Sequence, residues 1–446
     1  MTLAIAIAMA VLDGTIANTA LPTIARELRA SPAESIWIVN GFQLAVAAST
    51  LVFAALGQLH GPARIYRAGL VAFVAGSLAC ALAQTLPLLI AARVFQGLGA
   101  SAIMAISPAL VRAVFPRAQL GRAFGLNAMV VATSLAAGPT IGGLILAVLP
   151  WPWLFALNVP LGLVCIALNR ALPHDERTGG RLDVASVLSS AVGLGLLFWG
   201  LDGFSRHDPG WTIALRLAGG AASTAWFVRR GFTLEQPMIA LDVFRIPRFA
   251  FAAATSFATF SAQGLAFVAL PFFFQVSLGR TPLESGLLLT PWPLAVALVA
   301  PLAGRLADRF PVGIIATTGL AGLTLGLGLY AALRPHPSAV EIVLRGLVCG
   351  FGWGFFQSPN NRELMGSVPR EKSPSAGGLL AAIRTSGQTA GAAIVAIVFG
   401  VFGGAATGGQ DAIAHGVPLV LWLACGCAGI ATIASGLRLR SAGATS

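Results

Sequence analysis

Charged side chains are scarce in this chain of 446 residues. Only 10% of its residues are Asp, Glu, Lys or Arg, against about 25% in an ordinary soluble domain, while 57% are hydrophobic. The mean hydropathy of +0.83 is too high for a protein that folds in water. This composition excludes a soluble enzyme, a disordered protein and a coiled coil, and it predicts a helical protein that crosses a membrane many times.

Catalytic and metal-binding patterns are also missing. The sequence contains no H-E-x-x-H motif, no G-x-S-x-G elbow and no phosphate-binding P-loop. Its five histidines fall in loops or at the ends of apolar segments, and its five cysteines lack metal-ligand spacing. We therefore expect no enzyme, no cofactor and no metal centre. The energy source should be an ion gradient or the gradient of the substrate itself.

Acidic residues are fewer than basic ones, 16 against 28, which gives a net charge of +12. In a soluble protein this surplus would suggest nucleic acid as a partner. Here the basic residues occur in small groups between apolar segments, which is typical of cytoplasmic loops in a membrane protein. We therefore expect contact with anionic membrane lipids and none with nucleic acid.

Apolar runs of about 18 residues or more, bounded by charged or turn residues, indicate membrane-spanning helices. The sequence contains fourteen of them. Their approximate limits are 2–21, 35–56, 66–84, 86–110, 124–149, 151–169, 184–203, 211–228, 249–278, 283–303, 312–333, 339–359, 375–404 and 415–437. The predicted fold class is therefore an all-α polytopic membrane protein.

The basic residues between the spans predict the orientation. With the N-terminus inside the cell, nineteen basic residues fall in cytoplasmic segments and five in outer loops. This asymmetry follows the positive-inside rule, and a miscount by one span would invert every later loop. We therefore predict both termini in the cytoplasm and the cytoplasmic (inner) membrane as the location.

The second half of the sequence echoes the first. Gly57-Gln58-Leu59 matches Gly304-Arg305-Leu306, Arg93 matches Arg345, and Gly138-Pro139 matches Gly387-Gln388, at offsets of 247, 252 and 249 residues. Repeated halves of this kind are typical of transporters that open a central cavity to either side. We predict a six-helix bundle at 1–170, a linker with two extra helices at 171–248, and a second six-helix bundle at 249–446.

Ionisable residues inside spans cost about 2.5–3.5 kcal/mol on insertion scales and are therefore candidates for function. There are five, namely Asp13, Arg93, Arg216, Arg345 and Arg384. Asp13 is the only acidic residue in the middle of a span, about 16 Å along its helix and close to the bilayer midplane. Arg93 lies at a depth from which its long side chain can reach Asp13.

Burial favours the neutral form of a carboxyl group, while a neighbouring arginine favours the charged form. A carboxyl group under both influences could take up and release a proton. We therefore predict that Asp13 and Arg93 couple transport to protons. The alternative interpretation is a permanent ion pair that only holds two helices together.

Two more sets of residues are expected to matter. The segment Gly138-Pro139-Thr140-Ile141-Gly142-Gly143 lets helices approach closely and bend, so Gly138, Pro139, Gly142 and Gly143 are expected to act in conformational change. Polar side chains inside spans are candidates for lining a substrate cavity. They are Asn18, Gln43, Gln96, Asn127, Gln263, Asn360, Arg384 and Gln388.

These segments together resemble the major facilitator superfamily, and in particular its branch of fourteen-span drug:proton antiporters of the multidrug efflux type. The motifs are Leu12-Asp13-Gly14-Thr15-Ile16-Ala17-Asn18-Thr19-Ala20-Leu21-Pro22 in span 1, Arg93-Val94-Phe95-Gln96-Gly97-Leu98-Gly99 in span 4, the glycine segment of span 5, and the stretch from Trp151 to Gly162 in span 6. The resemblance implies two six-helix bundles with two extra central helices.

One segment departs from the family pattern. The loop after span 2 reads Gly57-Gln58-Leu59-His60-Gly61-Pro62-Ala63-Arg64, so it lacks an acidic residue that helps to latch the two halves in the superfamily. The second copy keeps Gly304, Asp308 and Arg309, which the resemblance places in gating. The first half is expected to gate more weakly or through another contact.

The expected function is proton-coupled export of lipophilic compounds of cationic or amphipathic character across the cytoplasmic membrane. The alternative is a dedicated exporter of one metabolite, such as a siderophore or a secondary product. The expected partners are a small-molecule substrate, protons and membrane lipids; a periplasmic adaptor would be expected only in a cell with two membranes. A membrane sensor and an intramembrane enzyme lack their signatures, namely an aqueous domain and paired acids or a nucleophile.

Overall fold

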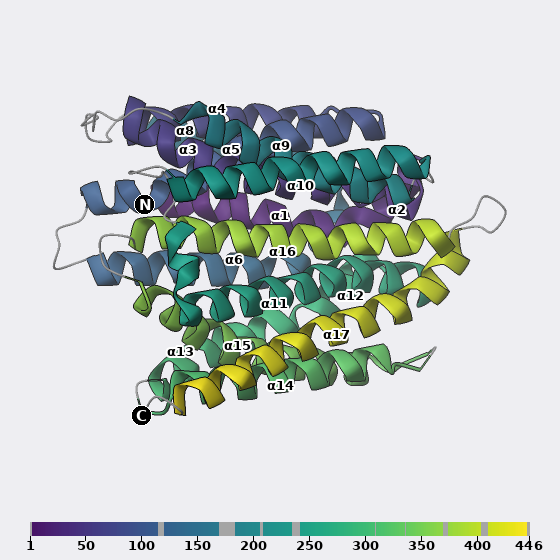
Figure 1. Ribbon diagram of the computed structural model, residues 1–446. Helices are drawn as coiled ribbons and strands as arrows, with labels where there is room; N and C mark the ends of the chain where they lie inside the picture. Colours follow the sequence, from purple (N-terminus) through teal and green to yellow (C-terminus); the bar gives the residue numbers. More distant parts are fainter. Residues whose placement is uncertain are drawn as a thin grey trace. The chain divides into compact units, whose positions relative to one another are not determined.

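The computed structural model describes residues 2–114, 120–168, 183–205, 208–233, 241–307, 309–334, 336–368, 373–402 and 409–443. Within these ranges every regular element is a helix (Figure 1). The chain divides into two compact units. Unit 1 comprises Met1–Gly203 and His207–Thr233, and unit 2 comprises Phe204–Arg206 and Leu234–Ser446.

Unit 1 begins with four helices that alternate with short turns and continues with six more. They are α1 (Thr2–Glu27), α2 (Pro32–Ser35), α3 (Trp37–His60), α4 (Pro62–Ala81), α5 (Leu86–Val114), α6 (Leu120–Val148), α7 (Trp153–Ala156), α8 (Asn158–Leu168), α9 (Val184–Ser205, whose last two residues fall in unit 2) and α10 (Gly210–Thr233).

Unit 2 opens with a short 3-10 helix, η3, and its first long helix ends in a π-helical turn, η4. The elements are η3 (Leu241–Arg245), α11 (Pro247–Phe272), η4 (Phe273–Ser277), α12 (Pro282–Leu289), α13 (Pro291–Leu306), α14 (Val312–Ala331), α15 (Ala339–Gly366), α16 (Ser373–Phe402) and α17 (Gly409–Gly443).

Each of the fourteen predicted spans coincides with one helix or with two consecutive helices of the described ranges, which confirms the predicted fold class. Span 6 is the pair α7 and α8, and span 10 is the pair α12 and α13. Nine described helical segments are long and apolar enough to cross a bilayer alone, and three shorter apolar segments accompany them. Helices such as α15 continue past the predicted limit because hydropathy detects only the apolar part of a helix.

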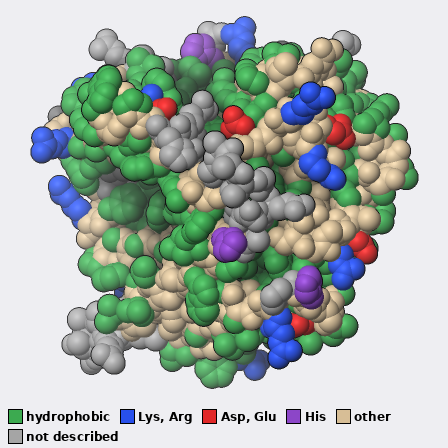
Figure 2. All heavy atoms as spheres, turned by 90° about the vertical axis from the view of Figure 1, so that its right-hand side faces the viewer, with side chains coloured by type: hydrophobic (Ala, Val, Ile, Leu, Met, Phe, Trp, Pro, Cys, Tyr) green, Lys and Arg blue, Asp and Glu red, His purple; other side chains and the backbone are tan. Residues whose placement is uncertain are grey.

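Large apolar side chains lie on the outside of the helices. Leu298, Leu325, Ile430 and Ile433 are each more than half exposed. Exposed apolar surface of this extent indicates contact with something other than water, and in a chain with so many apolar helices that partner is lipid. Figure 2 looks onto one end of the helices and shows charged and histidine side chains there, among hydrophobic ones.

Glycines let α5 pack closely against both α3 and α4 in unit 1. A Cβ atom at Gly97 would lie 2.6 Å from the carbonyl oxygen of Phe42 in α3, and one at Gly99 would lie 2.3 Å from the amide nitrogen of Phe73 in α4. The motif R-x-x-Q-G-x-G therefore contains glycine where two backbones meet. This contact also fixes Gln96, directly before Gly97, and Arg93, one turn earlier, between the same helices.

The same packing recurs in unit 2. A Cβ atom at Gly350 of α15 would lie 2.3 Å from the carbonyl oxygen of Trp292 in α13, and one at Gly352 would lie 2.3 Å from the amide nitrogen of Leu323 in α14. The sequence repeat is therefore also a repeat of helix contacts.

The turn before each second helix is repeated as well. Ser31 caps α2 by accepting a hydrogen bond from the amide of Glu34, and Thr281 caps α12 by accepting one from the amide of Glu284. Both are capping boxes with a proline at the start of the helix. The residue two positions before each cap has positive φ, at 51° for Arg29 and 63° for Gly279.

Helices α9 and α10 pack against each other as a hairpin. Ser223 Oγ of α10 donates to the carbonyl oxygen of Ser189 at 2.9 Å, and a Cβ atom at Gly193 would lie 2.5 Å from Thr224 Oγ1. Asp183, just before α9, pairs with Arg230 at the far end of α10 at 3.0 Å. Hydrogen bonds from Arg230 lower the pKa of Asp183 to about 2, so this ion pair persists at every physiological pH.

Candidate functional site

Asp13 occupies the middle of α1 and is almost fully buried. Only 2% of its surface is exposed, and neighbouring residues on α1 belong to the core of unit 1, including Met9, Ala10 and Ala17. A carboxylate in such surroundings needs hydrogen-bond donors on both oxygens because water does not reach it. The remaining helices of unit 1 supply these donors.

Arg93 of α5 supplies the charge. Its Nη1 atom forms an ion pair with Asp13 Oδ2, as the sequence analysis predicted from depth alone. Its Nε atom donates to the carbonyl oxygen of Ile38 in α3 at 3.1 Å. The guanidinium group also lies over two aromatic rings, 4.2 Å from the centroid of Phe42 and 5.3 Å from that of Phe155. These contacts hold a completely buried arginine in one position.

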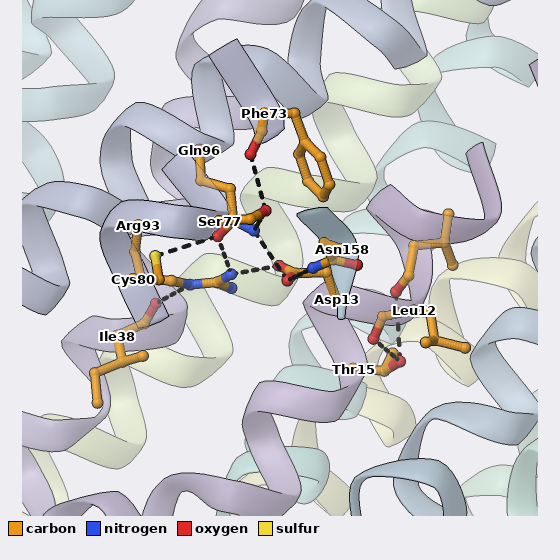
Figure 3. Close-up of polar contacts among 11 residues, drawn as sticks. Leu12, Asp13, Thr15, Ile38, Phe73, Ser77, Cys80, Arg93, Gln96 and Asn158 are labelled. Atoms are coloured by element: carbon orange, nitrogen blue, oxygen red, sulfur yellow. Dashed lines mark hydrogen bonds and ion pairs between the residues drawn. The ribbon is translucent and has the colours of Figure 1, made fainter. Parts of the chain in front are cut away.

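Gln96 and Asn158 complete the shell around the carboxylate (Figure 3). Gln96 Nε2 donates to Asp13 Oδ1 at 2.9 Å, and Asn158 Nδ2 of α8 donates to the same oxygen at 2.7 Å. Gln96 Oε1 accepts from Arg93 Nη1 at 2.6 Å, so the glutamine bridges both partners of the ion pair. The carboxylate therefore accepts from three side chains on two other helices.

A second ring of contacts orients the glutamine. Gln96 Nε2 also donates to Ser77 Oγ at 2.8 Å, and Cys80 Sγ donates to Gln96 Oε1 at 3.6 Å; both residues belong to α4. Ser77 Oγ in turn donates to the carbonyl oxygen of Phe73. With every hydrogen-bonding atom engaged, the amide of Gln96 has one possible orientation. Arg93 Nη2 is the one buried atom of this group left without a partner.

The carboxylate of Asp13 joins α1 to α5 and α8, and Gln96 extends the hydrogen-bonded group to α4. Protonation of Asp13 would remove the charge that holds the donors of Arg93, Gln96 and Asn158 together. Because the group is closed to solvent, a proton can reach it only after the surrounding helices move. The geometry can therefore convert the gain or loss of one proton into a change of helix packing.

The glycine segment of α6 lies against α1 next to this site. A Cβ atom at Gly138 would lie 2.0 Å from Thr15 Oγ1, and one at Gly142 would lie 3.4 Å from the carbonyl oxygen of Ile16. Gly143 is buried, and Pro139 lies within the helix between them. The close contact between α1 and α6 therefore occurs within one turn of Asp13.

The loop that departs from the family pattern is a single residue long. α3 ends at His60, Gly61 has φ of 95°, and α4 begins at Pro62. In unit 2 the corresponding connection spans residues 307–311, between α13 and α14. Gly304 lies in the last turn of α13 and Arg309 lies within this connection, whereas Asp308 lies outside the described residues.

The polar candidates in unit 2 are brought together on α11, α15 and α16. Gln388 Nε2 donates to Gln263 Oε1 at 2.9 Å, and Asn360 Nδ2 donates to Ser256 Oγ at 2.8 Å. Arg384 donates to Asn361, the neighbour of Asn360. Three helices thus present amide and guanidinium groups to one another.

The candidates in unit 1 are more scattered. Asn18 is buried on α1 with its Oδ1 atom unpaired, and Gln43 of α3 has a buried, unpaired Oε1. Gln96 belongs to the Asp13 group described above. The side chain of Asn127 lies outside the described set.

Sequence reasoning missed three members of the Asp13 group, namely Asn158, Ser77 and Cys80. Asn158 stands alone as an amide within an apolar stretch, a signal that could have identified it; Ser77 carries no such signal because serine is common in membrane helices. Sequence reasoning also missed that Arg345 pairs with Glu341, one turn earlier on α15. No group of three or more His, Cys, Asp or Glu in the described ranges is placed to hold a metal ion.

We expect Asn158→Leu to lower the free energy of unfolding by about 1.5–3 kcal/mol, because it removes a hydrogen bond to a buried charge. The measurement is titration of the purified protein with a denaturing detergent. Ser107→Ala is the matched control, since Ser107 is buried and donates only within its own helix. Equal loss in the two variants would contradict the role given to Asn158.

Comparisons with known proteins agree with this architecture. The family profile described as Major Facilitator Superfamily matches residues 3–392 and, a second time, residues 249–441. Among solved structures, a bacterial homologue of the human lysosomal transporter Spinster has a TM-score of 0.69 at 16% identity, covering 98% of this chain and 96% of that one. The nucleoside transporter NupG has a TM-score of 0.68 at 12% identity, covering 98% of both chains.

Curated relatives extend over nearly the whole sequence. The chain is 43% identical to the uncharacterized transporter YebQ of Escherichia coli (strain K12), covering 98% of this chain and 94% of YebQ. It is 32% identical to the riboflavin transporter RibZ of Clostridioides difficile, covering 89% of this chain and 86% of RibZ. It is 33% identical to the multidrug resistance protein Stp of Mycobacterium tuberculosis, covering 87% of this chain and 73% of Stp. The chain therefore belongs to the major facilitator superfamily and is a membrane transporter, not an enzyme.

Proposed function

We propose that this transporter exports lipophilic or amphipathic compounds in exchange for protons. The observation that carries the proposal is the closed group around Asp13. It contains the only carboxylate in the middle of a predicted span, and this carboxylate accepts from Arg93, Gln96 and Asn158. The side chains of the group come from four helices of unit 1. The close contact of α6 with α1 at Gly138 lies within one turn of this ion pair, where a change of charge can act on helix packing.

The mechanism follows from charge. In the closed state the carboxylate is paired, and its shell excludes water. When the helices open and a proton binds, the donors of Arg93, Gln96 and Asn158 lose their shared acceptor, so the packing of α1 against α5 and α8 weakens. Release of the proton on the other side restores the closed group. Alternating access driven in this way exchanges protons for substrate.

The proposal places the protein in the cytoplasmic membrane with both termini in the cytoplasm, because the basic residues concentrate in those segments. Its partners are a small-molecule substrate, protons and membrane lipids. The proton gradient takes the place of a cofactor.

Two names among the relatives bear on breadth of substrate. Stp of Mycobacterium tuberculosis and MdtD of Salmonella typhi, the latter 30% identical over 422 residues and described as putative, are named for multidrug resistance. RibZ is named as a transporter of a single compound, riboflavin. The relatives therefore favour a drug exporter and keep a dedicated exporter of one metabolite as the second candidate.

Proton flux in inside-out vesicles tests the proposal. We expect that lipophilic compounds added to vesicles with an imposed acid-inside pH gradient trigger proton release through the protein. The matched control is vesicles prepared from the same cells without it. Proton release triggered by many unrelated compounds supports multidrug export. Proton release triggered by a single compound supports the dedicated exporter. Transport of compounds without any change in pH would contradict proton exchange.

A further inference from the structure

Arg384 is a cation inside unit 2 for which the described residues offer no counter-charge. It lies twelve positions into the thirty residues of α16, about 16 Å from the start of that helix and therefore far from its ends. Its Nη2 atom donates to Asn361 Oδ1 at 2.5 Å, and its Nε atom is buried without any partner. An amide can accept a hydrogen bond from a guanidinium group but cannot neutralise it.

The other three arginines inside predicted spans differ in this respect. Arg93 pairs with Asp13, Arg216 with Asp208, and Arg345 with Glu341. Asp13, the only acidic residue in the middle of a predicted span, belongs to unit 1 and already has three donors. A guanidinium group does not lose its proton in a protein, so Arg384 stays charged. Holding an unpaired charge in a membrane interior is costly, which points to a charge supplied from outside the chain.

An aromatic ring lies beside this cation, and a second ring packs against the first. The guanidinium carbon of Arg384 lies 5.3 Å from the ring centroid of Phe260 in α11, and Phe260 meets Trp353 of α15 edge to face at 5.0 Å. The Gln388–Gln263 pair follows one turn further along α16. The surroundings therefore combine a fixed positive charge, an unused donor, two large rings and neutral amides.

We propose that Arg384 binds the acidic group of an amphipathic aromatic substrate, such as a carboxylate or a phenolate. This inference rests on the proposed function, because it names the substrate class of the same transporter. The planar guanidinium group matches the geometry of a carboxylate, and the free Nε donor supplies the bond that Asn361 leaves open. Phe260, which lies beside the guanidinium group, is the ring against which the aromatic part would stack. The substrate is therefore an organic anion and not a lipophilic cation.

Two dyes with the same xanthene frame and opposite charge test this. Fluorescein is an anion and pyronin Y is a cation. Their dissociation constants are measured by fluorescence polarisation with the purified full-length protein in lipid nanodiscs. We expect Arg384→Gln to weaken fluorescein binding by about tenfold to a hundredfold, the worth of a hydrogen bond to a charged group. The dissociation constant of pyronin Y should be no higher for Arg384→Gln than for the wild type.

Two further variants separate charge from structure. Arg384→Lys keeps the charge without the planar fork and should retain part of the fluorescein affinity. Arg345→Gln is the matched control, because it removes a helical arginine of the same unit that has its own carboxylate partner. It should leave the dissociation constants of both dyes unchanged. If Arg384→Gln does not fold, Arg384→Lys is used in its place. The ratio of its affinity for fluorescein to its affinity for pyronin Y is then compared with the ratio in the wild type.

Several outcomes overturn the proposal. The proposal is wrong if the wild-type protein does not bind fluorescein. It is also wrong if Arg384→Gln lowers the affinity for fluorescein and for pyronin Y equally. A small inorganic anion is the other source of negative charge. If chloride, compared with gluconate, raises the thermal stability of the wild type but not of Arg384→Gln, and fluorescein does not compete with it, the site holds chloride and not an organic acid.

These measurements are independent of proton coupling because binding in nanodiscs needs no gradient. If fluorescein binding depends on Arg384 but no compound drives proton release, the acid site is supported and proton exchange is contradicted. If pyronin Y drives proton release and Arg384→Gln does not affect that release, proton exchange is supported and the acid site is contradicted.

Discussion

Asp13→Asn is expected to abolish substrate-driven proton release. Asparagine keeps the size of the side chain but cannot gain or lose a proton, so the cycle of pairing and release stops. The substitution also leaves the Arg93 charge buried without a partner, which should lower the free energy of unfolding by about 3–5 kcal/mol. Flux is measured in the vesicle assay and stability by titration with a denaturing detergent. Asp183→Asn, which removes the ion-paired carboxylate just before α9, is the control and should leave flux intact.

A double variant separates coupling from folding. Asp13→Asn together with Arg93→Met removes both charges, so most of the lost stability should return. Proton release should remain absent, because no titratable group is left at the centre. Recovery of flux together with stability would show that Asp13 only holds helices together and that coupling lies elsewhere.

Gly138→Leu is expected to reduce transport to the level of empty vesicles. Even a single Cβ atom at this position would lie 2.0 Å from Thr15 Oγ1 and 2.8 Å from Thr15 Cβ. A change of rotamer can move Oγ1, but Thr15 Cβ is fixed by the backbone of α1. The larger side chain must separate α6 from α1 within one turn of Asp13. Overpacking of this kind lowers the free energy of unfolding by about 1–3 kcal/mol. Vesicle flux and detergent titration on the same preparation give both quantities.

The chain offers a matched control and a rescue for this variant. Gly195 lies in α9 with open space where its Cβ would be, so Gly195→Leu should be neutral or slightly stabilising through its better helix propensity. Thr15→Ala removes the nearest contact and should partly rescue Gly138→Leu. Full transport by Gly138→Leu would show that close packing of α1 and α6 is not needed for the cycle.

Hydropathy and charge predicted the helices well because both are properties of individual residues and can be read along the sequence without knowledge of tertiary contacts. Each of the fourteen spans corresponds to helical structure in the described ranges, and depth along the spans was enough to pair Asp13 with Arg93. Hydropathy could not predict the break at Leu157 or at Thr290, since both lie within continuous apolar runs and the break depends on local backbone geometry.

The partners of the site were harder to predict for a physical reason. Asn158 contacts Asp13 across 145 positions of sequence, and no periodicity on either helix encodes which face of α8 meets which face of α1. Gln96 was predicted to line a substrate cavity because it is polar and lies in a span. Its position one turn after Arg93 places it in the Asp13 group. That the described residues offer Arg384 no counter-charge likewise became visible only once its neighbours were known.

The turns before α2 and α12 bear on the history of the protein. Arg29 and Gly279 share a left-handed backbone conformation at the same position relative to their capping boxes, 250 residues apart. Glycine adopts this conformation without strain, whereas arginine does so at a cost of about 1–2 kcal/mol. Two halves that arose separately would have no reason to share so specific a bend. The simplest account is duplication of an ancestral half-length gene, in which the backbone of the turn was inherited while its side chains drifted.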